Sequence, residues 1–269
     1  MATINSSSRS WMNWQRVRSW VGRVIEDPPK PAGHEDVSAL SPSKYKIKPG
    51  YIERDSPQYF EDVPDGTIYQ PDVYELAGLL ARLAGGHHLV DLGCGFGEKL
   101  VTACRRHGLM PIGMDHGKNL SHCREAYPDG KWIEVNFENP EPALLSEDVL
   151  KKSVIVCSDL VEHLKDPGPF VSVLRNWLQH AHLAVLSTPE RDVRWGGTHL
   201  GPPPNPHHIR EWNAEELHSY LQESGLTVNF VGLTRTKNTS YSMWTTLILL
   251  GPTKTTFVKS QESILKQHE

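Results

Sequence analysis

The sequence predicts an α/β protein in which helices cover both faces of a mostly parallel sheet. Short apolar runs recur along the chain, and stretches with helical periodicity lie between several of them. This alternation of strand and helix is typical of parallel sheets. The run at residues 88–92 also passes directly into a turn with glycine at three alternate positions. Such a turn at the carboxyl end of a parallel strand is typical of the nucleotide sites of open α/β sheets.

Local residue patterns predict the individual elements. Asp72 can cap a first helix, whose leucines form an apolar stripe before the glycine pair at 85–86 ends it. Asn213 and Glu216 have the spacing of a capping box, which predicts a later helix that ends at Gly225. Apolar runs of strand length lie at residues 88–92, 109–115, 132–137, 153–157, 183–187, 228–231 and 244–250.

The composition indicates one large globular domain with an extension. The chain has 269 residues, of which 38% are hydrophobic and 22% are charged, so it can form a full core. No apolar run approaches the ~20 residues that span a bilayer. The net charge of −4 gives no bulk electrostatic reason to bind nucleic acid. The four cysteines have no CxxC spacing, which argues against a zinc ribbon or a disulfide framework and favours a reduced, cytoplasmic setting.

The glycine-rich turn narrows the kind of nucleotide that can bind. A dinucleotide fingerprint has its third glycine three positions after the second, where this chain has Glu98. A Walker loop needs Gly-Lys-Ser or Gly-Lys-Thr, which the turn lacks. The remaining pattern, Asp-Leu-Gly-Cys-Gly-Phe-Gly at residues 91–97, resembles the class I S-adenosylmethionine-dependent methyltransferases. The turn residues expected to bind this cofactor are Asp91, Gly93, Cys94 and Gly95.

The resemblance continues in order along the following strands. It implies a Rossmann-like sheet of seven strands, mostly parallel, with an antiparallel last strand. The second strand ends in Asp115, where an acid can bind both hydroxyls of an adenosine ribose. By resemblance, the end of the third strand supplies the adenine pocket, with Asn136 as a hydrogen-bonding group and Phe137 as an apolar wall. The alternatives are a solvated aspartate and ordinary turn or core residues.

The segment after the fourth strand carries a second motif. Residues 162–167 read Glu-His-Leu-Lys-Asp-Pro and resemble the segment that follows strand four in ubiquinone-type and sugar-type small-molecule methyltransferases. The resemblance implies that the methyl group emerges here and that Asp159 contacts the cofactor. It also implies that residues before the first helix close over the cofactor or contact its methionine part, with Tyr59, Phe60 and Gln70 as candidates.

A long loop follows the fifth strand, and its second half is too rich in glycine and proline for a helix or strand. A long loop inside a compact domain is usually functional, although a surface excursion without a role is the alternative. Its runs Ser-Thr-Pro-Glu-Arg-Asp, at 187–192, and Asn-Pro-x-His-x-Arg-Glu-Trp, at 205–212, look like segments of methyltransferases from bacterial glycan and natural-product clusters. That resemblance implies a polar, sugar-like small-molecule acceptor.

Two histidines are the candidate catalytic residues. Methyl transfer from a sulfonium is an in-line displacement, so the protein must mainly hold the acceptor in line and remove the proton of a hydroxyl group. His163, at the mouth of the fourth strand, is the first candidate base, and His208 is the second. Histidine suits this role because it titrates near neutral pH, although a loop histidine is more often a surface residue.

A divalent metal is a less favoured alternative. Asp159, Glu162 and His163 are spaced i, i+3 and i+4, so they would share one face of a helix, and His207 or His208 could complete the ligand set. Small-RNA 2′-O-methyltransferases and some ubiquinone-pathway enzymes carry a comparable cluster with a divalent ion. The match is partial, because the RNA enzymes have Glu-His-His where this chain has Glu-His-Leu.

The chain is expected to comprise an N-terminal extension, residues 1–45, a methyltransferase domain, residues 46–252, and a C-terminal tail, residues 253–269. Tryptophans and valines recur at helical spacing among arginines over residues 8–24, which predicts an amphipathic basic helix. It is more often a face that packs on the protein itself or on a second subunit than a peripheral membrane anchor. The N-terminus lacks the apolar core of a secretory signal, and the sequence leaves the oligomeric state open.

Three functions remain at this stage. The preferred one is S-adenosylmethionine-dependent O-methylation of a polar small molecule, such as a sugar, a glycan precursor or a natural product. A metal-assisted RNA 2′-O-methyltransferase is the second, although it needs a basic surface that the net charge of −4 does not indicate. A non-catalytic cofactor-binding scaffold is the third.

Overall fold

The computed structural model describes residues 43–56, 70–235 and 244–252. The predicted amphipathic helix at residues 8–24, the lid candidates Tyr59 and Phe60, and the tail at 253–269 lie outside the described residues. Within the ranges described, no helix combines the length and the apolar character needed to cross a membrane.

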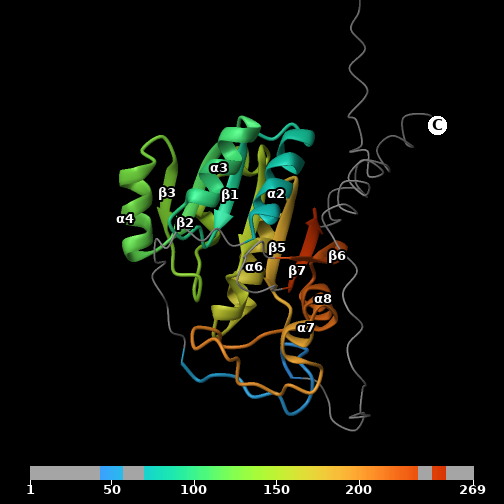
Figure 1. Ribbon diagram of the computed structural model, residues 1–269. Coiled ribbons are helices and arrows are strands. Elements are labelled where there is room, and N and C mark those ends of the chain that lie inside the picture. Colours follow the sequence, from blue (N-terminus) through green and yellow to red (C-terminus); the bar gives the residue numbers. More distant parts are fainter. Residues whose placement is uncertain (1–42, 57–69, 236–243, 253–269) are drawn as a thin grey trace, which may run out of the picture.

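In the described part of the chain, one sheet of seven strands forms the centre of the molecule (Figure 1). The strand order is β3-β2-β1-β4-β5-β7-β6, and neighbouring strands are parallel except that β7 is antiparallel to both β5 and β6. The strands are β1 His88–Leu92, β2 Met110–Asp115, β3 Lys131–Glu134, β4 Ser153–Ser158, β5 Leu183–Pro189, β6 Thr227–Arg235 and β7 Trp244–Gly251. The predicted sheet and its antiparallel last strand are confirmed.

Helices connect the strands and cover the sheet. The α-helices of the described residues are α2 Pro71–Leu83, α3 Glu98–His107, α4 Gly117–Ala126, α5 Glu147–Leu150, α6 Pro167–Trp177, α7 Arg191–Trp195 and α8 Ala214–Glu223. Two single turns of 3₁₀ helix, η1 Pro142–Leu144 and η2 Val161–His163, complete the described helical segments.

Both faces of the sheet are buried. Successive residues of a strand point to opposite faces, so neighbouring residues show what covers each face. Leu89 and Val154 contribute to an apolar cluster with residues of α2 and α3. Their chain neighbours Val90 and Ile155 contribute to a second cluster with residues of α6 and α8. The strands therefore read as continuous apolar runs, as expected of a sheet covered on both faces.

Local hydrogen bonds explain how the elements begin and end. The predicted capping box is confirmed, since the Asn213 side chain accepts from the Glu216 N–H at 2.8 Å and the Glu216 carboxylate accepts from the Asn213 N–H at 3.1 Å. The third strand is shorter than predicted because the Asn136 side chain accepts from the Glu138 N–H and turns the chain. Asp72 is not the cap of α2, because the helix begins after Gln70.

The order of the strands indicates where a ligand would bind. The chain runs outward from β1 to β3 and then returns to β4 on the other side of β1, and ligands of open α/β sheets bind at the carboxyl ends of the strands at such a reversal. Residues 43–56, blue in Figure 1, lie beside the long orange loop after β5. Two backbone hydrogen bonds join them, from the Ile52 N–H to the Leu200 carbonyl at 2.7 Å and from the Arg54 N–H to the Ile209 carbonyl at 2.9 Å.

Candidate functional site

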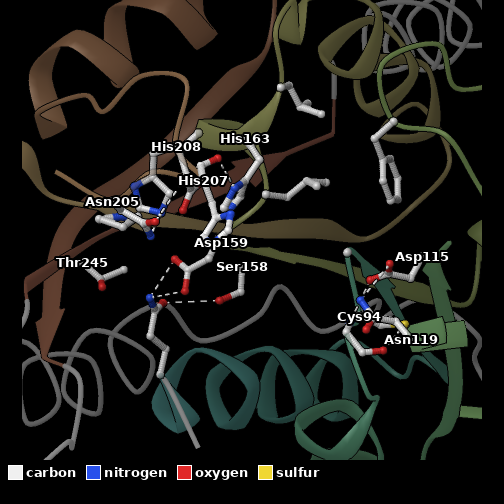
Figure 2. A pocket seen from close by; sticks show the side chains of 18 of the residues that line it. Cys94, Asp115, Asn119, Ser158, Asp159, His163, Asn205, His207, His208 and Thr245 are labelled. Atoms are coloured by element: carbon white, nitrogen blue, oxygen red, sulfur yellow. Dashed lines mark hydrogen bonds between the residues drawn. The ribbon is translucent and has the colours of Figure 1, made fainter. Parts of the chain in front are cut away.

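A cavity of about 350 Å³ lies at this reversal, lined by the glycine-rich turn, the ends of β2, β4 and β5, and the long loop. Its volume is in the range of pockets that bind small molecules. Figure 2 shows two polar groups on its opposite sides. One group contains Cys94, Asp115 and Asn119, and the other contains Ser158, Asp159, His163, Asn205, His207, His208 and Thr245.

The turn after β1 brings bare main chain to the cavity wall. Gly93, Gly95 and Gly97 all have positive φ, at 81°, 53° and 76°. A Cβ atom at Gly93 would lie 3.3 Å from the side chain of Leu160, and a Cβ atom at Gly97 would lie 2.9 Å from Trp132. Gly93, Cys94 and Gly95 line the cavity, and their contact with the cofactor stays a prediction. The turn therefore forms a tight cradle that only glycine allows.

Asp115 lies next to this cradle at the end of β2. Its carboxylate accepts from the Gly95 N–H at 2.8 Å, from the His116 N–H at 2.7 Å and from the Asn119 side chain at 3.3 Å. Burial raises the pKa of Asp115, while these donors act in the opposite direction. A carboxylate fixed beside a glycine-rich cradle fits the ribose diol of an adenosine cofactor, so the residues present fit S-adenosylmethionine.

The structure brings some of the other predicted cofactor residues to the cavity and leaves two away from it. Phe137 lines the cavity. Asp91 is fully buried, and burial together with the nearby Asp91 carboxylate raises the pKa of Tyr74. Asn136 is exposed and holds the turn after β3. Neither Asp91 nor Asn136 lines the cavity, so their contacts with the cofactor stay predictions.

Gln70 and Asp159 both line the cavity and are hydrogen-bonded to each other. The Gln70 amide donates to Asp159 Oδ1 at 2.7 Å, while its carbonyl oxygen accepts from Ser187 at 3.0 Å and from Ser158 at 3.3 Å. Both Gln70 and Asp159 have left-handed backbones, with φ of 53° and 55°. Such strain in non-glycine residues often marks functional sites. Gln70 thus fixes Asp159 and ties the ends of β4 and β5 together.

The expectation that Asp159, Glu162 and His163 share one helical face is wrong. Asp159 has a left-handed backbone, and only the single 3₁₀ turn η2 follows it, so the segment is not an α-helix. The ligand atoms of Glu162, His163 and His208 instead lie within 4.8 Å of one another. One carboxylate oxygen and two imidazole nitrogens could hold a divalent cation, and the predicted metal stays a prediction.

His163 is held as a neutral side chain. Its Nδ1 lies 2.9 Å from the His207 carbonyl oxygen, which can only accept, so Nδ1 carries the proton. Burial, together with the nearby His208, lowers the pKa of His163 to about 3. His163 therefore presents a lone pair on Nε2 but is a weak base at neutral pH.

His208 is fixed between two partners. Asn205 Oδ1 accepts from the His207 N–H at 3.0 Å, which leaves the Asn205 amide to donate to His208 Nε2 at 2.8 Å. On the other side, His208 Nδ1 lies 2.5 Å from Glu211 Oε1. Burial opposes ionisation of Glu211, but His208, the Trp195 indole N–H and a nearby arginine outweigh it and lower the pKa of Glu211. His208 is therefore held with its proton on Nδ1 and its lone pair on Nε2.

Glu162 is a buried acid beside these histidines. Its Oε2 accepts from the Thr188 hydroxyl at 2.9 Å, and its Oε1 has no partner among the described residues. Burial and the charge of Asp159 raise the pKa of Glu162 well above its usual range. Its free oxygen favours either a protonated carboxyl or a bound cation.

Several residues of the site were not among the predicted site residues. Glu211 does not line the cavity but contacts His208; the sequence motif contained it without assigning it a role. Lys99 and Arg194 are the lysine and the arginine among the described residues that line the cavity. The remaining additions are His116, Asn119, Ser158, Leu160, Leu164, Pro189, Asn205 and Thr245, while His207, named only as a possible metal ligand, also lines the cavity.

The loop that carries His208 is fastened by a buried arginine. Arg191 is fully buried, and its guanidinium donates to both carboxylate oxygens of Glu216, at 2.6 and 2.9 Å. It also donates to Asp192 at 2.8 Å, and the Asn213 amide donates to the same carboxylate at 2.7 Å. These contacts join the start of α7 to the start of α8 and so fix both ends of the loop.

The Asp192→Asn substitution is expected to reduce the free energy of unfolding by about 1–3 kcal/mol at neutral pH, because it removes a charged hydrogen-bond acceptor. Burial opposes ionisation of Asp192, but Arg191 and Asn213 outweigh it and lower its pKa. A lowered pKa stabilises the fold above the unfolded value of about 3.9, and this contribution is lost as the pH falls through the folded value. Denaturant titrations at several pH values should show the difference from wild type shrinking in acid.

Asp148→Asn is the matched control, because that side chain is 93% exposed. Its effect should be small at every pH. An Asp192→Asn variant with the same acid dependence as wild type would contradict the assigned role.

The sheet order, the glycine cradle and the acid after β2 together define a class I S-adenosylmethionine-dependent methyltransferase. Comparison with known families agrees. The model of the family described as "Methyltransferase domain" matches residues 69–229, more than half of the chain. The chain belongs to this family.

The chain is also similar to individual methyltransferases. It is 31% identical over 152 residues to the "Probable S-adenosylmethionine-dependent methyltransferase" of Mycolicibacterium smegmatis, a match that covers 55% of each chain. It is 29% identical over 109 residues to the "Ubiquinone biosynthesis O-methyltransferase" of Coxiella burnetii, covering 40% of this chain and 46% of the relative. The chain thus spans about half the length of these curated relatives.

Solved structures share the fold at low identity. The [4+2]-cyclase SpnF matches with a TM-score of 0.52 and 13% identity, over 74% of this chain and 87% of its own. A structure concerned with the conversion of a disulfide bond into a thioacetal group during echinomycin biosynthesis matches with a TM-score of 0.51 and 15% identity, over 77% and 91%. At these identities the similarity shows the fold alone.

Proposed function

We propose that this chain transfers the methyl group of S-adenosylmethionine to a hydroxyl group of a polar small molecule, such as a sugar, a glycan precursor or a natural product. The observation that carries the proposal is the pair formed by His208 and Glu211, which presents an unprotonated Nε2 in the cavity that Asp115 and the glycine cradle also line. S-adenosylmethionine supplies an electrophilic methyl group on a sulfonium.

The two sides of the cavity take different tasks in this proposal. Asp115 binds the ribose hydroxyls, the main chain of the turn at 93–95 lies against the cofactor, and Phe137 packs on the adenine. Gln70 and Asp159, which are hydrogen-bonded to each other, bind the methionine part. The proposal is supported by the fact that all these residues line the same cavity.

His208 is the proposed base. The acceptor hydroxyl replaces the Asn205 amide at His208 Nε2 and gives its proton to that nitrogen, while Glu211 stabilises the charge that develops on the imidazole. His163 was the first candidate from the sequence, but with a pKa of about 3 it suits a role as neighbour and hydrogen-bond acceptor better. The name of the Coxiella burnetii relative, an O-methyltransferase, also favours a hydroxyl acceptor.

A metal-assisted RNA 2′-O-methyltransferase is the second candidate. It is favoured by one observation, the approach of Glu162, His163 and His208 to within 4.8 Å. In that case His208 Nε2 would face a divalent cation and could not take the proton. The two candidates therefore differ in the partner of one nitrogen atom.

The test is methyl transfer from isotope-labelled S-adenosylmethionine to three acceptor classes: nucleotide sugars, a catechol, and a small RNA. Each reaction is run with the metal-free protein in EDTA and again with added Mg²⁺ or Mn²⁺. We expect label on a small molecule and an unchanged rate in EDTA. Transfer to RNA alone, in a reaction that EDTA abolishes and a divalent ion restores, would replace the first candidate by the second. Transfer to a small molecule that needs the ion would remove His208 as the base.

A further inference from the structure

We propose that the acceptor carries an anionic group, a carboxylate or a phosphate, and that the guanidinium of Arg194 binds it. This inference rests on the proposed function, because it assigns Arg194 to the acceptor rather than to the cofactor. Arg194 lies in α7, directly after β5, and lines the cavity together with Asn205 and His208. Arg194 lies over the Trp195 ring, and the Trp195 indole N–H donates to Glu211, the partner of His208, which places Arg194 near the proposed base.

The other permanent cation of the cavity belongs to the cofactor side by its place in the chain. Lys99 is the second residue of α3, immediately after the glycine-rich turn, and its ammonium lies 5.1 Å from the centre of the Tyr74 ring. Lys99 therefore suits the carboxylate of the cofactor's methionine part. Arg194 follows β5 rather than β1, so it is the cation left to bind the acceptor.

The guanidinium of Arg194 can bind a ligand, whereas those of the buried Arg191 and Arg210 are already paired with acids. Arg191 is bound to Glu216, and Arg210 is bound to Glu53. Among the residues that the structure describes, Arg194 has no hydrogen bond or ion pair from its side chain, and it stacks on the Trp195 indole at 4.5 Å. An arginine that is half-buried in a pocket without an acid partner is suited to bind a ligand carboxylate or phosphate through its planar fork of donors.

Three acids near the proposed base each accept a hydrogen bond from a neighbouring side chain. Asp159 accepts from Gln70, Glu162 accepts from Thr188, and Glu211 accepts from His208. The Trp195 indole N–H also donates to Glu211, at 2.8 Å. The same glutamate therefore positions both the proposed base and the ring on which Arg194 rests. An anion bound at Arg194 would sit at a fixed place relative to His208 Nε2.

The experiment measures binding of three sugars to the full chain saturated with S-adenosylhomocysteine, by calorimetry or by saturation-transfer NMR. Glucuronate carries a carboxylate, glucose 1-phosphate carries a phosphate, and glucose carries neither. The variants are Arg194→Gln, which removes the charge, and Arg194→Lys, which keeps the charge but not the fork. Arg124→Gln is the matched control, since Arg124 is exposed on α4 and does not line the cavity.

We expect wild type and Arg124→Gln to bind one of the anionic sugars about tenfold more tightly than glucose, and Arg194→Gln to lose this preference. Arg194→Lys should keep part of it, and the preferred sugar identifies carboxylate or phosphate. Equal binding of all three sugars by wild type, or a preference that survives in Arg194→Gln, would overturn the proposal. Weaker binding of S-adenosylhomocysteine by Arg194→Gln would also overturn it, because Arg194 would then serve the cofactor.

The failure of the proposed function gives a different result. A wild-type chain that does not bind S-adenosylhomocysteine at all would contradict the methyl-transfer proposal. The same sugar comparison, made on the ligand-free chain and its variants, would still decide whether Arg194 binds anions.

Discussion

Replacing His208 by asparagine is expected to lower kcat by about 10²–10⁴-fold, the usual contribution of a general base, while the affinity for S-adenosylmethionine stays unchanged. Asparagine retains a polar group in the space but cannot take a proton. The expected split follows from the geometry, since His208 lies with the acceptor-side residues and Asp115 lies across the cavity (Figure 2). Steady-state kinetics and calorimetric titration of the same preparations measure the two quantities.

His218→Asn is the matched control, because His218 lies on α8 and does not line the cavity. It should leave kcat unchanged. A His208→Asn variant that turns over at the wild-type rate would remove His208 from the chemistry. A variant that loses cofactor affinity in parallel with kcat would move His208 from the acceptor side to the cofactor side.

Glu211→Gln should lower kcat by about 10–100-fold, the range found when a partner that orients a functional histidine is removed. Glutamine can still fill the space, but it no longer offers a carboxylate to Nδ1–H. The ¹⁵N chemical shifts of the His208 ring report the position of its proton independently of activity. A variant with wild-type shifts and reduced activity would show that Glu211 acts through the loop fold and not through His208.

The side of the cavity proposed to bind the cofactor could be predicted because it is built from short motifs at the ends of neighbouring strands. The turn at 93–95 and Asp115 follow two neighbouring parallel strands, so their approach is a consequence of strand pairing. Asp91 and Asn136 show the limit of that reasoning. The side chain of Asp91 points into the layer under α2, and that of Asn136 closes a turn. Which face of a strand a side chain takes depends on the packing around it.

The side of the cavity proposed to bind the acceptor could be predicted only as a set of residue types. His163 and His208 come from segments separated by β5 and the long loop, and their rings lie 4.9 Å apart only after the loop folds back. The fold of this loop depends on the buried Arg191 and on backbone contacts with residues 43–56. The spacing of apolar residues in the sequence does not predict such contacts. The pairing of Glu211 with His208 and the availability of Arg194 therefore needed the structure.

Replacing Asp115 by alanine is expected to weaken S-adenosylmethionine binding by about 100-fold or more, because two hydrogen bonds from the ribose hydroxyls to a buried carboxylate are lost. The measurement is calorimetric titration of the purified chain. Asp129→Ala is the control, since Asp129 lies in the exposed turn after α4. Wild-type affinity in Asp115→Ala would show that Asp115 does not bind the cofactor, and the glycine turn would then have only a structural role.

Asp115 also accepts the Gly95 N–H, so its removal could loosen the turn itself. The conservative Asp115→Asn variant separates the two effects. Its side-chain oxygen can still accept one backbone N–H, but its amide group cannot accept from a ribose hydroxyl. We expect Asp115→Asn to have a Tm near that of wild type without ligand and to lose most of the cofactor affinity. A large loss of Tm with cofactor affinity retained would instead make Asp115 a brace of the glycine turn.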